Sequence, residues 1–121
     1  MPLIPKIIKR LNAKRINQIE NFIRHPVEKQ QQVLSALLDS ASGTEWGSKY
    51  NYASIKSADK YRLAVPVQTY EKMIPWIERL RSGEKDLLWP GEIKWFAKSS
   101  GTTSSKSKFI PVSQESLEHC H

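Results

Sequence analysis

The stretch that decides the fold is "KWFAKSSGTTSSKSKFIPVS", which runs from Lys94 to Ser113. Its ends are rich in aromatic and branched aliphatic residues, which favour short β-strands, so we expect strands over 93–98 and 108–112. Its middle contains seven consecutive serine, threonine and glycine residues, a composition that is also common in flexible linkers. Because both flanking segments are apolar enough to be buried, the sequence predicts a strand–loop–strand unit and not a tether.

The composition of this loop favours the binding of an anion. Serine and threonine hydroxyls can donate hydrogen bonds, and a glycine lets successive backbone N–H groups face one concavity. A lysine at the far end of the loop adds a mobile ammonium group with three donors. We therefore expect the loop to bind the phosphates of a nucleotide. The candidate binding residues are Ser99, Ser100, Gly101, Thr102, Thr103 and Lys108.

Two well-known phosphate loops do not fit this stretch. The Walker pattern G-x-x-x-x-G-K-[ST] needs a second glycine and a helix immediately after it. Here Gly101 is the only glycine of the loop, and a strand is expected to follow. The dinucleotide fingerprint G-x-G-x-x-G fails for the same reasons. The loop is therefore neither a Walker loop nor a dinucleotide-binding loop.

Upstream of this stretch, apolar spacing and capping residues predict mainly helices. Apolar residues recur every three or four positions over 4–23, which indicates an amphipathic helix ending near His25-Pro26. A second helix follows Pro26, and we expect the two helices to pair. A basic amphipathic N-terminus also suits a membrane-surface anchor or a transit peptide, but its narrow aliphatic stripe favours a partner helix.

The segment over 43–57 looks like a loop whose aromatic residues attach it to the core. Ser57 and Thr69 are expected to cap the next two helices, and Gly83 to close the second of them. Pro75 should kink or restart that helix. The motif "DLLWPGE" indicates a turn, and Ser113 opens a last helix.

Two short strands joined by a loop need neighbouring strands to be stable. We therefore expect a mainly helical chain with one strand–loop–strand unit, forming the opening of a larger α/β protein whose remainder lies downstream. The expected organisation is a helical segment over 1–88, followed over 89–121 by the first part of a truncated large domain.

At this point the chain resembles a known family. "SSGTTSSKSK" resembles the first ATP/AMP-binding motif of the adenylate-forming superfamily, and its form is closest to the auxin-responsive Gretchen Hagen family of acyl-acid amido synthetases. "GTEWGSKY" and "VPVQTYEKMIPWIERLRSGEKDLLWPG" are also similar, in order and spacing, to the N-terminal part of those proteins. The plant members have small residues and a glycine where this chain has Ser104 and Ser105. "DLLWPG" and "KWFAK" resemble a bacterial-type branch, which argues against a plant-hormone substrate.

The resemblance implies an ATP-dependent acid–amino acid ligase with an adenylate-forming type of α/β fold. In such a ligase a carboxylic acid is activated as an acyl-adenylate and then transferred to an amino acid or another amine. Lys108 matches the closing lysine of the motif. The phosphate-binding part of the motif is matched by Ser99, Ser100, Gly101, Thr102 and Thr103. ATP and Mg²⁺ are the implied cofactors. The family's later motifs are absent, so we expect this chain alone to bind ATP weakly and to have no catalytic residue and no ligase activity.

The net charge of +7 raises a second hypothesis, a small basic helical module that binds nucleic acid or a protein partner. The excess lies mainly in residues 1–25 and 94–108, and no recognised nucleic-acid motif accompanies it. No apolar run approaches the length of a membrane span, and no secretory signal is apparent. With a single cysteine, a reducing cytoplasm is the expected location.

Two further groups of residues invite a functional interpretation. His119, Cys120 and His121 are possible metal ligands, but adjacent residues on a helix point in different directions, so no metal site is predicted. The four tryptophans are too scattered to form a base-stacking face and are expected to anchor the core and the loops.

Overall fold

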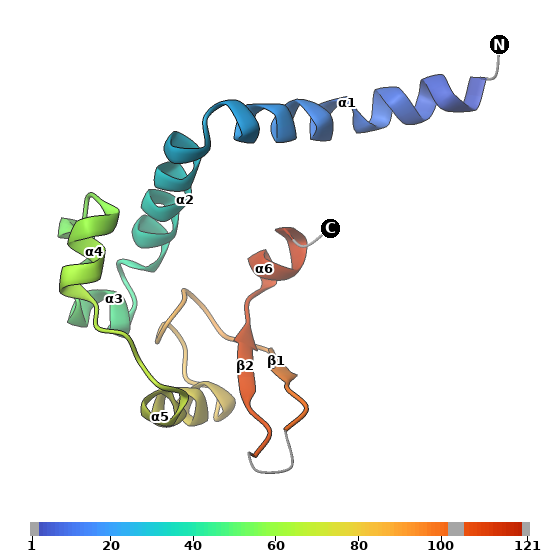
Figure 1. Cartoon of the computed structure of the whole chain (residues 1–121). Helices are drawn as coiled ribbons and strands as arrows, with labels where there is room; N and C mark the ends of the chain where they lie inside the picture. The colour runs from blue at the N-terminus through green and yellow to red at the C-terminus, as the bar shows by residue number, and fades with distance from the viewer. Residues whose placement is uncertain (1–2, 102–105, 120–121) are drawn as a thin grey trace.

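The computed structural model describes residues 3–101 and 106–119 of the chain. This part is mainly helical and carries one two-stranded antiparallel sheet, as predicted (Figure 1). The elements are α1 (Leu3–Arg24), α2 (Pro26–Ala41), α3 (Glu45–Lys49), the 3₁₀ helix η1 (Tyr52–Ser54), α4 (Ala58–Ala64), α5 (Tyr70–Arg81), β1 (Trp95–Lys98), β2 (Phe109–Val112) and α6 (Gln114–His119).

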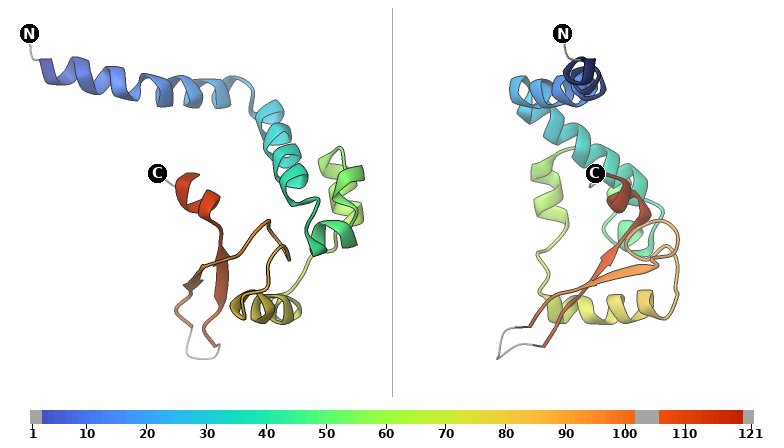
Figure 2. Two further views of the ribbon diagram at one scale, coloured as in Figure 1. Left: turned by 180° about the vertical axis from the view of Figure 1, so that it is seen from behind. Right: turned by 90° about the vertical axis from the view of Figure 1, so that its right-hand side faces the viewer.

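Helices α1 and α2 do not pack side by side, and the prediction that they pair is wrong. Figures 1 and 2 show α1 leading away from the rest of the described chain, and none of the residues of α1 is buried. The direction changes at His25, whose backbone has φ −133° and ψ 58°, because the following Pro26 disfavours the helical conformation there. The apolar stripe of α1 is consequently exposed.

A first core cluster joins the helices of the middle of the chain. It consists of Leu38, Trp46, Ile55 and Val65, which come from α2, α3 and the segments after η1 and α4. The sequence predicted a loop over 43–57, and this was wrong in part, because α3 and η1 lie within it. The cause is local: Thr44 acts as an N-cap, and its side chain accepts a 3.0 Å hydrogen bond from the backbone N–H of Gly47.

A second cluster fixes α5 to the segment that leads into the sheet. It consists of Leu80, Leu87 and Ile93. The predicted ends of α5 are confirmed, since Thr69 caps its start and Gly83, at φ +94°, follows its end. The helix does not restart at Pro75, because a proline removes only one helical hydrogen bond and the rest of the helix is held by packing.

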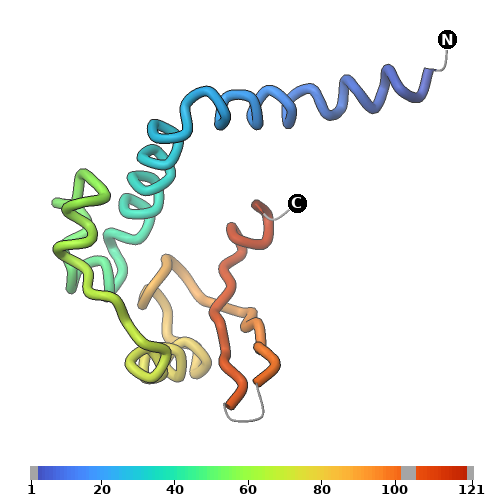
Figure 3. The backbone as a smooth tube through the Cα atoms, viewed as in Figure 1, coloured from blue at the N-terminus to red at the C-terminus, as the bar shows by residue number. Residues whose placement is uncertain are grey.

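The sheet pairs Trp95 with Val112 and Lys98 with Phe109 in antiparallel register. Both strands fall within the predicted ranges, although each begins slightly later. The backbone trace in Figure 3 shows the chain leaving α5, crossing the turn over 86–92 and returning beside α5 as the sheet. The side chain of Trp89, in that turn, donates a hydrogen bond of 3.1 Å to Glu115 of α6. In the part of the chain that the structure describes, no helix has the length and apolar character to cross a bilayer.

Candidate functional site

The predicted phosphate loop begins and ends at a closed stem. The backbone N–H of Ser99 donates to the carbonyl oxygen of Lys108 at 2.9 Å, and the N–H of Lys108 donates to Ser99 Oγ at 3.0 Å. One backbone hydrogen bond thus continues the antiparallel ladder beyond the two strands, and the side chain of Ser99 supplies the second contact. This arrangement fixes the two ends of the loop next to each other.

The described site residues differ in exposure. Ser99 is half-buried in the stem, whereas Ser100, Gly101 and Lys108 are exposed. Thr102 and Thr103, the other two predicted site residues, lie outside the described residues. The structure thus brings Ser99 and Lys108 together, and it leaves Ser100 and Gly101 open to a ligand.

Tyr70, the first residue of α5, contacts the stem directly, and sequence reasoning gave it no role in the site. Its hydroxyl accepts a hydrogen bond of 2.8 Å from the N–H of Phe109 and lies 3.5 Å from the carbonyl oxygen of that residue. The ammonium of Lys108 lies 5.5 Å from the centroid of the Tyr70 ring, within the range of a cation–π interaction. The two segments are 39 residues apart, so no local pattern could have indicated the contact.

Two further basic side chains gather at Phe109. The guanidinium carbon of Arg81 lies 4.2 Å from the centroid of the Phe109 ring, and the ammonium of Lys98 lies 5.9 Å from it. Arg81 is also paired with Glu78 at 3.0 Å. Basic side chains thus lie beside the stem, one of them paired with an acid, and a local excess of positive charge attracts anions.

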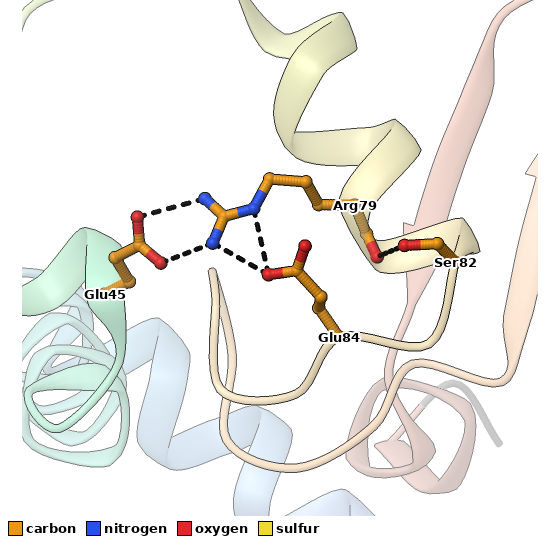
Figure 4. A network of polar contacts seen from close by, with 4 residues as sticks. All are labelled: Glu45, Arg79, Ser82 and Glu84. Atoms are coloured by element: carbon orange, nitrogen blue, oxygen red, sulfur yellow. Dashed lines mark hydrogen bonds and ion pairs between the residues drawn. The ribbon is translucent and has the colours of Figure 1, made fainter.

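An ion-pair network supports α5 from the side of α3 (Figure 4). Arg79 donates two hydrogen bonds to the carboxylate of Glu45, at 3.0 and 2.7 Å, and a third of 2.9 Å to Glu84. Hydrogen bonding by Arg79 holds the pKa of Glu45 below its ordinary value of 4.5. The network ties α3 and the turn after α5 to the helix that carries Tyr70.

We expect the stabilising effect of Glu45 to depend on pH. Its pKa is lower in the folded chain than in the unfolded chain, so its contribution is present above about pH 4.5 and is lost as the pH falls through the folded pKa. The variant Glu45→Gln should therefore be less stable than the wild type near neutral pH and should approach it near pH 3. Urea midpoints at the two pH values measure this difference, with Glu20→Gln on α1 as the matched control. An equal difference between Glu45→Gln and the wild type at both pH values would contradict the assignment.

The other candidate groups carry no site in the described structure. Of the possible ligands at the C-terminus, Cys120 and His121 lie outside the described residues. Across 3–101 and 106–119, no three histidine, cysteine or acidic residues are grouped so that they could hold a metal ion. Trp46 is buried, and its ring meets that of Trp76 edge to face with 5.1 Å between the ring centroids. Trp76 is partly buried and packs against both core clusters, which confirms that these two tryptophans anchor the core.

Comparisons with known proteins match most of the chain. The sequence model of the GH3 family N-terminal domain matches residues 15–121. The chain is 31% identical over 108 residues to indole-3-acetic acid-amido synthetase GH3.2 of Arabidopsis thaliana, covering 88% of this chain and 20% of the relative. It is 30% identical over 118 residues to the probable indole-3-acetic acid-amido synthetase GH3.1 of the same plant, covering 97% and 20%.

A third relative has a different acid in its name. The chain is 27% identical over 118 residues to jasmonoyl-L-amino acid synthetase JAR6 of Nicotiana attenuata, covering 96% of this chain and 20% of the relative. The chain thus spans about a fifth of the length of the curated relatives it matches.

Proposed function

The chain belongs to the GH3 family, and on this premise we propose that it supplies the phosphate-binding loop of an ATP-dependent acid–amino acid ligase. The names of its relatives describe synthetases that join an acid to an amino acid or form an amide. We extend to this chain only the class of substrates, a carboxylic acid and an amine. The observation that carries the proposal is the closed stem between Ser99 and Lys108.

The proposed reaction has two steps. A carboxylate oxygen attacks the α-phosphorus of ATP, the bond to the leaving pyrophosphate breaks, and an acyl-adenylate forms. An amine nitrogen then attacks the acyl carbon, AMP leaves, and an amide forms with loss of a proton from the nitrogen. The chain's own contribution is electrostatic: donors held in place stabilise the charge that develops on the phosphates.

The donor set of the loop fits a triphosphate. Ser100 and Gly101 are exposed at the start of the loop, and the ammonium of Lys108 is exposed at its end, so both ends can donate to phosphate oxygens. Mg²⁺ prefers oxygen ligands, commonly carboxylates and phosphates, and the side chains described beside the stem include the cations of Arg81, Lys98 and Lys108. A magnesium ion would therefore be bound mainly by the phosphates themselves, where it would neutralise part of their charge.

The remaining walls of the site are proposed to come from polypeptide equivalent to the rest of the relatives' length, in an α/β domain of the adenylate-forming type. The division of this chain near residue 88 remains part of the proposal. Because Ser100, Gly101 and Lys108 are exposed, a triphosphate would contact the described chain on one side only. We expect weak binding and no ATP–pyrophosphate exchange by the purified chain. Measurable exchange would show that the chain contains a complete site.

Removal of the closing lysine tests the proposed role of the loop. We expect Lys108→Ala to weaken the binding of tripolyphosphate by at least about tenfold, because a hydrogen bond between charged groups is lost. Calorimetric or NMR titration measures the affinity. Lys85→Ala, in the turn after α5, makes the same change in net charge away from the stem and should have little effect. Equal losses in the two variants would mean that net charge, and not the loop, binds the anion.

A second candidate function is a basic binding module for nucleic acid or a protein partner. It is favoured by α1, which is exposed along its whole length and carries both the apolar stripe and a cluster of basic residues. Salt-sensitive binding of the chain to DNA or RNA, with no response of the loop to tripolyphosphate, would support this candidate against the ligase.

A further inference from the structure

We propose that Tyr70 is a positioning residue for Lys108, so that helix α5 sets the place of the lysine that closes the phosphate loop. This inference rests on the proposed function of the loop. It arises from a contact between two segments that the sequence places far apart. The hydroxyl of Tyr70 accepts a hydrogen bond from the backbone of Phe109, the residue next to Lys108.

The strand register explains why Phe109 needs a partner outside the sheet. Residues opposite each other in an antiparallel pair alternate between hydrogen-bonded and non-hydrogen-bonded positions. Ser99 and Lys108 occupy a hydrogen-bonded position, because the N–H of Ser99 donates to the C=O of Lys108, so the next pair, Lys98 and Phe109, is non-hydrogen-bonded. The N–H and C=O of Phe109 therefore point away from β1, toward the outer edge of β2.

The hydroxyl of Tyr70 occupies that outer edge. It accepts from the N–H of Phe109 at 2.8 Å, and at 3.5 Å it is placed to donate to the C=O of the same residue. One hydroxyl thus takes the place of a neighbouring strand at this position. A sheet edge left unpaired would be free to shift or to bind another chain.

Helix α5 holds the side chain of Phe109 as well as its backbone. Arg81, in the last turn of α5, lies 4.2 Å from the Phe109 ring, while Tyr70 holds the backbone from the first turn. Tyr70 is itself fixed at the helix start, where Thr69 Oγ1 accepts from the N–H of Lys72 at 3.4 Å. Because Phe109 is covalently joined to Lys108, these contacts restrict the backbone from which the lysine projects.

The ring of Tyr70 has a second, weaker effect. The ammonium of Lys108 lies 5.5 Å from its centroid and is exposed, and cation–π attraction at exposed sites is weak. The ring can therefore orient the ammonium without competing strongly with phosphate oxygens. The hydroxyl and the ring make separable contributions, which two variants can measure.

The test uses the full 121-residue chain and tripolyphosphate. Tyr70→Phe removes the hydroxyl and keeps the ring, and Tyr70→Leu removes both. In Tyr70→Phe we expect the amide of Phe109 to exchange with solvent at least about fivefold faster and the affinity for tripolyphosphate to fall about fivefold. The ring-current shift of the Lys108 methylene protons should persist in Tyr70→Phe and disappear in Tyr70→Leu. Tyr50→Phe, which changes a tyrosine packed against the first core cluster, is the control and should change none of these values.

Each outcome decides a different point. If the wild type binds tripolyphosphate and Tyr70→Phe binds equally well, the positioning role is wrong, whether or not the exchange rate changes, and the proposed function stands. If Phe109 exchange is unchanged, the hydrogen bond does not hold the stem, and the inference is also wrong. If the wild type gives no response to tripolyphosphate, the proposed function fails, and this inference fails with it.

Discussion

Replacing Gly47 by alanine is expected to lower the free energy of unfolding by about 3 kcal/mol or more, because the added methyl group has no space. A Cβ atom at this position would lie 2.0 Å from the carbonyl oxygen of Ala41, which is a backbone atom and cannot rotate away. The same carbonyl accepts hydrogen bonds from both the N–H and the hydroxyl of Thr44, at 3.1 and 2.7 Å. Relief of the clash would therefore disrupt the cap of α3 and move Trp46 out of the first cluster.

Gly43 provides the matched control for this change. A Cβ at Gly43 would meet nothing within 4 Å, so Gly43→Ala should alter stability by less than about 0.5 kcal/mol. Urea unfolding followed by tryptophan fluorescence reports both variants, since Trp46 lies in the affected cluster. Equal stability of the two variants would show that the close approach of α3 to the end of α2 is wrong.

Leu80→Ala is expected to cost about 2–5 kcal/mol, the usual range for removing a fully buried leucine. Leu80 is the most buried hydrophobic residue of the described chain, with 1% of its surface exposed, and it packs against Leu87 and Ile93. Its loss would leave a cavity in the cluster that attaches α5 to the start of β1. We therefore expect the hydrogen bond between Tyr70 and Phe109 to weaken as well, although neither residue is changed.

Leu63 serves as the comparison for Leu80, because it is 89% exposed. Leu63→Ala should change the free energy of unfolding by less than about 0.5 kcal/mol. Denaturant midpoints give the stabilities, and amide exchange at Phe109 reports whether the stem loosens. A Leu80→Ala variant as stable as Leu63→Ala would mean that the second cluster contributes little to the fold.

Local signals made much of the helical structure predictable. The caps at Ser57 and Thr69, the proline that starts α2 and the glycine that follows α5 act through hydrogen bonds and backbone angles within a few residues. Their physical causes are contained in short stretches of sequence. For this reason the ends of these helices agree with the prediction.

The predictions from sequence differ from the structure where contacts between distant residues decide how a helix is placed or continued. The angle between α1 and α2 depends on the backbone of His25 and on what each helix buries, and the apolar stripe of α1 alone could not show that it finds no partner among the described residues. Of the two effects predicted at Pro75, a kink or a restart, the restart does not occur, because α5 runs unbroken past it and buries Ile77 and Leu80. For both helices the tertiary contacts, and not the local sequence preference, decide the outcome.

In the candidate site, too, the local features were predictable from the sequence and the tertiary contacts were not. The composition of the segments that flank the loop predicted the two strands, and the pairing of Ser99 with Lys108 follows directly from them. The contacts that hold this stem from outside, made by Tyr70 and Arg81 of α5, join residues far apart in sequence and have no local signature. The resemblance to the GH3 family, confirmed over residues 15–121, could identify the motif but not these supports.

The most direct test of the central claim is an NMR titration of the 121-residue chain with tripolyphosphate, observing all backbone amides at moderate salt. If the loop binds phosphates, the changes in amide chemical shift will be concentrated at Ser99, Ser100, Gly101 and Lys108. These changes will be lost in the combined variant Ser100→Ala with Lys108→Ala. Shifts spread over the basic face of α1, or equal shifts in the wild type and the combined variant, would contradict it.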